Sequence, residues 1–261
     1  MSLEQQFDWQ NKIDIKSLEF GELEEHLAAM GQPKFRSKQI YSWLHEKRVD
    51  SFDQMSNLPA ALREQLEQRY YINRLSIIKK LVSKLDGTQK YLLRLKDNNC
   101  VEAVLMKYKY GNSICISTQV GCRMGCRFCA STLAGLVRSL DSSEMLDEIY
   151  TVTRDSGQRV SNVVLMGIGE PLDNYENVMR FLRILSSEQG YNLSLRHLSL
   201  STCGLVDRIY ELAQEKCGLT LSISLHAPND AIRSQTMPIN KRYPIDELLK
   251  ACRYYLQKNL L

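Results

Sequence analysis

Three cysteines lie within eight positions of one another in the segment GCRMGCRFCAS, residues 121–131. They are Cys122, Cys126 and Cys129, separated first by three residues and then by two. A disulfide uses two thiols and a structural zinc site usually uses four ligands, so a set of three needs another explanation. Three thiolates can hold three irons of a [4Fe-4S] cluster and leave the fourth iron open to a substrate or cofactor. The spacing therefore favours an iron–sulfur site.

Zinc is the alternative, because CxxC pairs are common zinc ligands. A structural zinc site usually takes its four ligands from two well-separated pairs, and the sequence offers no second pair. His226 completes such a site only if folding brings it beside the cysteine segment. The remaining cysteines are Cys100, Cys115, Cys203, Cys217 and Cys252.

The composition is that of an ordinary globular protein. Of 261 residues, 44% are apolar and 25% are charged, and the net charge is +4. No apolar run is long enough to span a bilayer, and the N-terminal segment lacks the apolar centre of a signal peptide. We therefore expect a cytoplasmic protein, where clustered cysteines bind metals or do redox chemistry more often than they form disulfides. The mild positive charge permits a nucleic-acid partner without requiring one.

The elements that must position the cysteines fall into three zones. Residues 1–74 have helical periodicity and are predicted to form an accessory domain. Its basic residues Arg36, Lys38, Lys47 and Arg48 indicate either a solvated helix face or an RNA-contacting one. Residues 75–110 are predicted to be a β-strand linker region with a turn at DGT. From residue 111 to 261, strand-like and helix-like segments alternate, which indicates parallel strands with crossover helices.

The strands of the third zone alternate apolar residues with small or polar ones. We expect these strands at residues 113–121, 162–170, 196–202 and 219–227, with helices at 142–154 and 174–187 between them. One face would pack under helices and the other would line a cavity inside an incomplete barrel. The alternative is that these segments are edge strands whose polar face is exposed to solvent. The residues predicted to face the cavity are Cys115, Ser117, Gln119, Ser199, Ser201, Ser222, Ser224 and His226.

Four segments resemble the RlmN/Cfr group of RNA adenine methyltransferases, within the radical S-adenosylmethionine (SAM) superfamily. They are STQVGCRMGCRFCASTLAGLVR, LMGIGEPLDNYENV, LSTCG and SLHAPNDAIRSQTMPIN. CxxxCxxC alone is fairly specific for the superfamily, and the four segments together are highly specific for the group. The resemblance covers essentially the whole chain. It implies an α/β fold: a partial (βα)6-type barrel with a small helical N-terminal domain and a short β-hairpin extension.

The resemblance also implies a cofactor site. Cys122, Cys126 and Cys129 would ligate a [4Fe-4S] cluster whose open iron binds SAM. The segment containing Gly169 and Glu170 would meet the methionine end of SAM, since a carboxylate beside bare backbone suits an ammonium group. The other implied SAM contacts are Ser201, Ser224, Leu225 and His226. Read without the resemblance, GIGEP is a turn and His226 is a structural residue at a strand end.

Two further residues take part in methyl transfer by resemblance. Glu102 would act as a proton acceptor on the substrate adenine. Cys115 would form a transient disulfide bond that releases the methylated product. Read alone, Glu102 is an exposed strand residue and Cys115 is a small core residue.

The implied activity is methylation of C2 of adenine in 23S rRNA and tRNA, using two SAM molecules. The resemblance also implies that the protein is a monomer without membrane association. It would receive electrons from a donor such as flavodoxin. The proline of GEPL favours C2 chemistry over the C8 chemistry of the Cfr branch, which stays the alternative. A third reading is a zinc-stabilised RNA-binding module.

The chain departs from the family at its C-terminal end. The family's methyl-carrier cysteine has no counterpart there, and about four of the six expected strand–helix units are present. Cys252 shares a predicted helix face with Leu248, Leu249 and Leu256, so we interpret it as a packing residue. We therefore expect a C-terminally truncated chain that is inactive unless the carrier is supplied. A non-catalytic protein that binds the cluster or RNA is the corresponding alternative.

Overall fold

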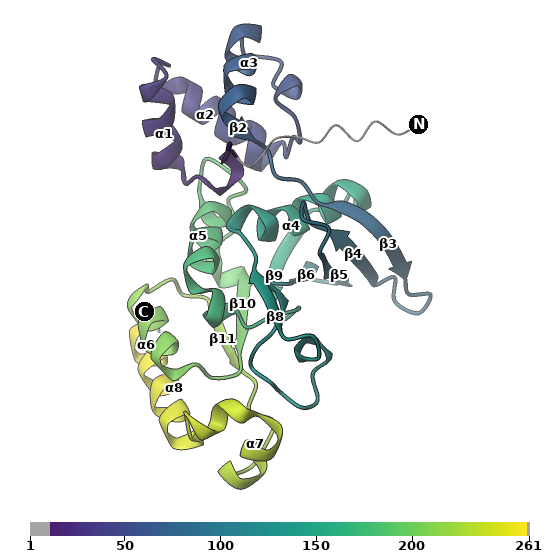
Figure 1. Ribbon diagram of the computed structural model, residues 1–261, viewed down its shortest axis with the longest axis vertical. Coiled ribbons are helices and arrows are strands. Elements are labelled where there is room, and N and C mark those ends of the chain that lie inside the picture. Colours follow the sequence, from purple (N-terminus) through teal and green to yellow (C-terminus); the bar gives the residue numbers. More distant parts are fainter. Residues whose placement is uncertain (1–10, 260–261) are drawn as a thin grey trace. The chain divides into compact units, whose positions relative to one another are not determined.

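The computed structural model describes residues 11–259, which form two compact units (Figure 1). The first unit comprises the residues up to Arg74 together with Arg183–Asn192. The second comprises Leu75–Leu182 and the residues from Leu193 onward.

The first unit is mainly helical. Its core contains Leu62 and Leu66, as the helical periodicity predicted, together with Ile40 and Leu44. Trp43, which lies in the same π-helical turn as Leu44, is half-buried. The elements are β1 (Ile13–Asp14), α1 (Phe20–Ala29), α2 (Phe35–Tyr41), η2 (Ser42–Glu46), α3 (Ala60–Arg69) and β2 (Tyr70–Tyr71), with short 3-10 turns η1 (Ile15–Ser17) and η3 (Phe52–Gln54).

The second unit is built on one seven-stranded sheet in the order β11-β10-β9-β6-β5-β4-β3. The strands β6, β9, β10 and β11 are parallel, and β3, β4 and β5 continue the sheet in antiparallel pairing. This is the α/β barrel fragment that the sequence predicted. The strands are β3 (Ser76–Val82), β4 (Gln89–Arg94), β5 (Cys100–Tyr108), β6 (Gly111–Ile116), β9 (Val160–Leu165), β10 (Leu198–Thr202) and β11 (Thr220–Ile223).

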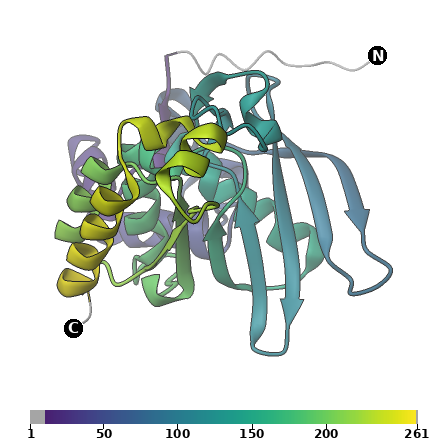
Figure 2. The same ribbon diagram turned by 90° about the horizontal axis from the view of Figure 1, so that it is seen from below.

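Residues 75–110 therefore belong to the same sheet as the parallel strands. The pair Val104↔Cys115 joins β5 to β6, and the hairpin β3–β4 extends from there to the sheet edge. Figure 2 shows the hairpins β3–β4 and β5–β6 (blue to teal) from below. Both turns lie at the same end of the sheet, because Gln89 at the first turn pairs with Leu105 near the second.

The predicted alternation between faces is present in β6 and β10. Ile114 and Leu200 are fully buried, whereas Cys115 and Ser201 on the other face are half-buried. The buried face packs under helices such as α4 (Ser142–Ser156), which contacts β5 and β6. Strand β11 differs, because its residues are half-buried on both faces except for exposed Thr220. It is one of the two edge strands of the sheet among the described residues, and β3 is the other.

The remaining helices lie after the parallel strands: α5 (Tyr175–Ser186), α6 (Val206–Gln214), α7 (Asp230–Thr236) and α8 (Ile245–Asn259). Helix α8 buries Leu248, Ala251 and Tyr255. The predicted packing face was wrong for Leu249 and Leu256, which are exposed. No helix among residues 11–259 has the length and apolar character needed to cross a membrane.

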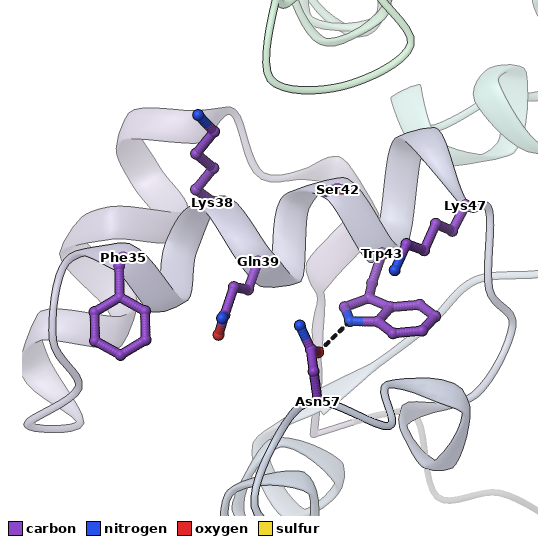
Figure 3. A pocket seen from close by; sticks show the side chains of 7 residues that line it. All are labelled: Phe35, Lys38, Gln39, Ser42, Trp43, Lys47 and Asn57. Atoms are coloured by element: carbon purple, nitrogen blue, oxygen red, sulfur yellow. Dashed lines mark hydrogen bonds between the residues drawn. The ribbon is translucent and has the colours of Figure 1, made fainter.

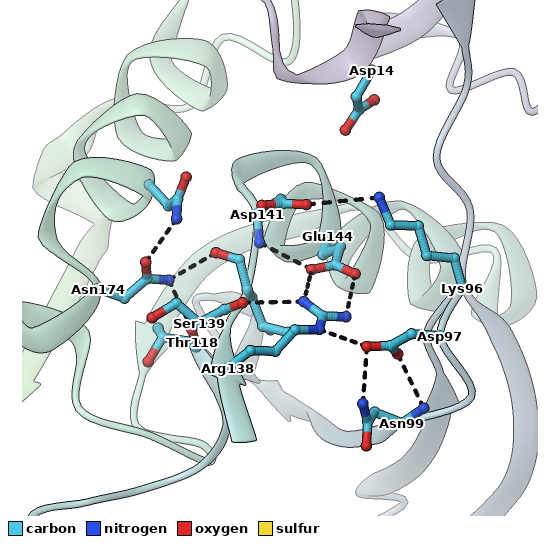
Figure 4. A network of polar contacts seen from close by, with 12 residues as sticks. Asp14, Lys96, Asp97, Asn99, Thr118, Arg138, Ser139, Asp141, Glu144 and Asn174 are labelled. Carbon is cyan, nitrogen blue, oxygen red and sulfur yellow. Dashed lines mark hydrogen bonds and ion pairs between the residues drawn. The ribbon is translucent and has the colours of Figure 1, made fainter. Parts of the chain in front are cut away.

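Arg138 connects the sheet to helix α4. It lies in β8 (Leu136–Ser139), and its guanidinium donates two hydrogen bonds to Glu144, of 2.7 and 2.9 Å. It donates a third, of 2.6 Å, to Asp97 in the turn after β4 (Figure 4). The hydrogen bond from Arg138 holds the pKa of the Asp97 carboxyl well below its ordinary value. Glu144 is completely buried and also accepts from the backbone N–H of Asp141, which begins α4.

Replacing Arg138 is expected to destabilise the second unit strongly. Arg138→Met leaves the buried Glu144 carboxylate without its cation, which costs about 3–5 kcal/mol of unfolding free energy. The matched control is Arg208→Met, whose partner Glu211 is 44% exposed. That change should cost less than about 1 kcal/mol. Urea unfolding of both variants measures the difference, and equal losses would contradict the role given to Arg138.

Candidate active site

The three cysteines of the CxxxCxxC segment lie on a loop between β7 (Gln119–Gly121) and the 3-10 turn η4 (Ala130–Thr132). Gly121 begins the loop with φ +75°, and a Cβ there would lie 1.9 Å from the carbonyl oxygen of Gly135. The hydroxyl of Thr132 donates to the carbonyl oxygens of Cys126 and Cys129, at 3.2 and 2.9 Å. The loop is thus closed by its own hydrogen bonds at the C-terminal end of the parallel strands.

The cysteine side chains are shielded from solvent. Cys122 and Cys126 are buried, and Cys129 is half-buried. Burial raises the pKa of Cys122 to about 11 and also raises that of Cys126, and the neighbouring thiols add to both shifts. Metal binding supplies the positive charge that such thiolates need. By donor type, burial and shared loop, the three side chains suit an iron–sulfur cluster. Within residues 11–259, no three His, Cys, Asp or Glu side chains lie close enough together to hold a single metal ion.

Gln119 joins the cysteine loop to the GIGEP segment. Its side-chain oxygen accepts from the backbone N–H of Glu170 at 2.9 Å, and its amide donates to Asp173 at 3.0 Å. Gly169 has φ +109°, and a Cβ there would lie 2.6 Å from the Cβ of Gln119. Only glycine therefore allows this close approach. Arg123 of the cysteine loop also donates to Asp173, at 3.1 Å through Nε.

Glu170 connects the ends of two strands. It is buried, and its two oxygens accept from the backbone N–H groups of Leu172 at 3.1 Å and Cys203 at 2.8 Å. Burial raises the pKa of the Glu170 carboxyl, while these hydrogen bonds act in the opposite direction. The carboxylate thus ties the segment after β9 to the segment after β10.

Arg233 makes the matching connection from helix α7. Its side chain is fully buried and donates to the carbonyl oxygens of Cys203 at 2.6 Å and Leu225 at 3.2 Å. It also donates to Asn240 at 2.9 Å. Sequence reasoning missed Arg233 and Asp173, whose only signal was a place inside the motif segments, and it placed Gln119 on the cavity face without giving it a role.

Of the other residues predicted to contact SAM, Ser201 lies in β10, and Ser224, Leu225 and His226 follow β11. The hydroxyls of Ser201 and Ser224 lie 3.4 Å apart. His226 adopts φ +51° and is exposed, and its ring meets the ring of Phe128 edge-on with centroids 4.9 Å apart. Because Phe128 precedes Cys129, this contact brings the end of β11 beside the cysteine loop. Leu225, which lies between Ser224 and His226 in the sequence, is half-buried.

Glu102 and Cys115 lie on neighbouring strands. Cys115 pairs with Val104, and Glu102 is two residues from Val104, so both side chains belong to one face of the sheet. Lys90 of β4 places its ammonium group 2.8 Å from the Glu102 carboxylate. Burial raises the pKa of Cys115 to about 11. The expected disulfide is not supported, because all eight cysteines, which lie within the described residues, are free.

Two family models match the chain. Residues 13–72 match the ribosomal RNA large subunit methyltransferase N-terminal domain, and residues 116–260 match the radical SAM superfamily. A probable dual-specificity RNA methyltransferase RlmN from Lachnospira eligens is 54% identical over 94% of this chain and 70% of its own length. A protein with the same description from Alkaliphilus oremlandii is 56% identical over 95% of this chain and 72% of its own. Both relatives are longer than this chain.

A solved structure is also similar. The crystal structure of a radical SAM methyltransferase from Sphaerobacter thermophilus superposes with a TM-score of 0.90 and is 41% identical. The match covers 95% of this chain and 74% of that one.

The close approach at Gly169 should make it intolerant of a side chain. Gly169→Ala forces a Cβ against Gln119 at an unfavourable φ, which is expected to cost about 2–5 kcal/mol of unfolding free energy. The control is Gly157→Ala, where φ is +66° but no atom lies within 4 Å of the added Cβ. Only backbone strain of about 1–2 kcal/mol applies there. Chemical unfolding of the two variants tests the difference, and an equally mild effect at Gly169 contradicts it.

The raised pKa of Cys115 should slow its alkylation. A pKa near 11 instead of 9.0 leaves about a hundredfold less thiolate at pH 8. The rate should keep rising with pH until it passes about 11. Mass spectrometry of the Cys115 peptide after timed iodoacetamide treatment measures this rate, with a free-cysteine peptide as the reference. A plateau near pH 9 would show that burial does not control this thiol.

Proposed function

Because this chain belongs to the RlmN family of radical SAM methyltransferases, we propose that it methylates C2 of adenine in 23S rRNA and tRNA. One observation carries the proposal: three separate strand ends meet at the cysteine loop. Gln119 and Glu170 join the loop to the ends of β9 and β10, and the contact between Phe128 and His226 joins it to β11. Cys115 lies on β6, the strand that precedes the cysteine loop, and Glu102 lies on the neighbouring strand β5.

In this proposal Cys122, Cys126 and Cys129 hold a [4Fe-4S] cluster. When bound, the cluster and SAM together supply the one-electron chemistry that reaches an unactivated ring carbon. The bare backbone at Gly169 admits the methionine end of SAM. The other SAM contacts are Glu170, Ser201, Ser224, Leu225 and His226.

Glu102 and Cys115 carry the proton and release steps. Glu102 accepts the proton that leaves C2 of adenine, and the ammonium group of Lys90 orients its carboxylate at 2.8 Å. Cys115 keeps its proton while the site is at rest, since its pKa is raised to about 11. Where a methyl-carrier cysteine is supplied, the Cys115 thiolate attacks its sulfur; an S–S bond forms as the bond from that sulfur to the product carbon breaks, and that carbon takes up a proton to complete the methyl group.

The first unit supports an RNA-contacting role for the accessory domain. A shallow pocket of about 360 Å³ combines aromatic rings with cations (Figure 3). The ammonium group of Lys47 lies 3.5 Å from the ring centroid of Trp43, whose indole N–H donates to Asn57. The pocket is lined by Phe35, Lys38, Gln39, Ser42, Trp43, Lys47 and Asn57.

We place the protein in the cytoplasm as a monomer, with reduction by a small electron-transfer protein such as flavodoxin. These assignments follow from the family and from the cysteine chemistry, which requires a reducing compartment.

The test is expression of the gene that encodes this chain in a strain lacking its own adenine methyltransferase of this family. Where the methyl-carrier cysteine is supplied, we expect 2-methyladenosine in digested tRNA and 23S rRNA, detected by mass spectrometry. Glu102→Gln and Cys115→Ala should abolish the product, while Arg208→Met serves as an active control. Anaerobically purified protein should contain about four irons per chain, and Cys126→Ala should lose them.

Each other outcome selects a different function. A product methylated at C8 would favour Cfr-like chemistry. Four irons without any methylated adenine would favour a non-catalytic cluster-binding protein. One zinc per chain and no iron would favour a zinc-stabilised RNA-binding module.

A further inference from the structure

The antiparallel strands β3, β4 and β5 have one covered face and one open face. The covered face contains Tyr91, Leu93 and Leu105, which are fully buried. Paired residues share a face, and the pairs Leu81↔Lys90↔Val104 and Lys79↔Leu92↔Glu102 define the opposite side. None of its residues is buried. This open face consists of Lys79, Leu81, Lys90, Leu92, Arg94, Glu102, Val104, Met106 and Tyr108.

The open face carries an excess of positive charge. Glu102 is its one acidic residue, and Lys90 pairs with it. The ammonium group of Lys79 has no ion-pair or hydrogen-bond partner among the described residues. Arg94, also exposed, donates within the described part of the chain only to the hydroxyl of Ser76, at 3.3 Å. Two cations on this face are therefore available to a negatively charged partner.

An aromatic pair stands at one end of the open face. The rings of Tyr108 and Tyr110 are stacked with centroids 5.1 Å apart and planes inclined by 3°. They are 46% and 75% exposed, so the stack is presented to solvent at the turn between β5 and β6. Lys107 and Lys109 alternate with them, and neither side chain has a partner among residues 11–259.

Exposed, stacked aromatic rings beside cations without ion-pair partners form a surface that suits single-stranded RNA. Bases stack on aromatic side chains, and phosphates are neutralised by lysine and arginine. On the open face, Tyr108 lies six residues after Glu102 along β5, about 20 Å away. A strand of RNA lying on the face therefore leads directly to the proposed proton acceptor.

We propose that the open face of β3–β5 binds the substrate RNA next to the target adenine. Lys79 and Arg94 contact the phosphates, and an unpaired base stacks on the Tyr108–Tyr110 pair. This inference rests on the proposed function, since it assumes that Glu102 meets the target adenine. The positive charge of the open face favours RNA as the partner. It disfavours a protein surface with few acidic residues, and it disfavours a second copy of this chain, which carries the same positive face.

The charge test compares two double variants that each remove two cations from the second unit. Lys79→Gln/Arg94→Gln alters the open face, and Arg253→Gln/Lys258→Gln alters exposed positions on α8. Binding of an unmodified tRNA transcript is measured by fluorescence anisotropy at several salt concentrations. The open-face variant should bind about tenfold more weakly at low salt, and its salt slope should fall by about 1–2. The α8 variant should behave like the unaltered chain.

The stacking test uses the tyrosine pair. Tyr108→Leu/Tyr110→Leu should weaken tRNA binding about tenfold with an unchanged salt slope, because stacking is lost and no charge is removed. Tyr108→Phe/Tyr110→Phe keeps the rings and should retain binding. All four variants change exposed side chains, and urea unfolding verifies that each is folded.

Three negative results are distinguishable. If the open-face and α8 variants bind tRNA equally, or if the leucine pair binds as well as the phenylalanine pair, this inference is overturned and the proposed function stands. If the unaltered chain binds no RNA, the proposed function fails as well. Self-association that the open-face substitutions abolish, without any effect on RNA binding, would assign the face to a second copy and also overturn the inference.

Discussion

The site depends on the hydrogen bonds that converge on the backbone of Cys203. Glu170 accepts from its N–H group at 2.8 Å, and Arg233 donates to its carbonyl oxygen at 2.6 Å. Glu170 belongs to the segment after β9, and Arg233 also reaches the carbonyl oxygen of Leu225 after β11. One peptide segment thereby fixes three strand ends. Since the cysteine loop is joined to Glu170 through Gln119, its position follows from the same contacts.

Burying a carboxylate and a guanidinium is costly unless their hydrogen-bonding capacity is used. Here both groups bind backbone, where strand ends leave N–H and C=O groups without ladder partners. The two charges thus replace the water that would otherwise solvate these ends. Such an edge needs little rearrangement to accept a ligand, because its polar groups are already oriented. Arg138 and Glu144 play a comparable part at the start of α4.

Much of this could be predicted from the sequence, since strand alternation and cysteine spacing are local patterns. Ile114 and Leu200 faced the helices as expected. Arg233 could not be foreseen, because its partners are backbone atoms brought close only by folding. The error on α8 has a similar cause. Leu248 and Leu249 are adjacent in sequence, and periodicity allows a buried stripe on either side. Contacts with other elements decide the side, and they selected the one containing Ala251 and Tyr255.

The antiparallel strands determine where Glu102 lies, which gives them more than a linking role. A slip of one residue in the pairing of β5 with β6 would turn Glu102 toward helix α4 and away from Cys115. Val104↔Cys115 pairing and the hydrogen bond from the Ser117 hydroxyl to the Glu102 carbonyl, at 2.9 Å, fix the register. On the covered face, Asp155 of α4 binds both Lys80 and Tyr91. Helix α4 therefore holds one face of the extension in register, and the opposite face, which carries Glu102, remains open.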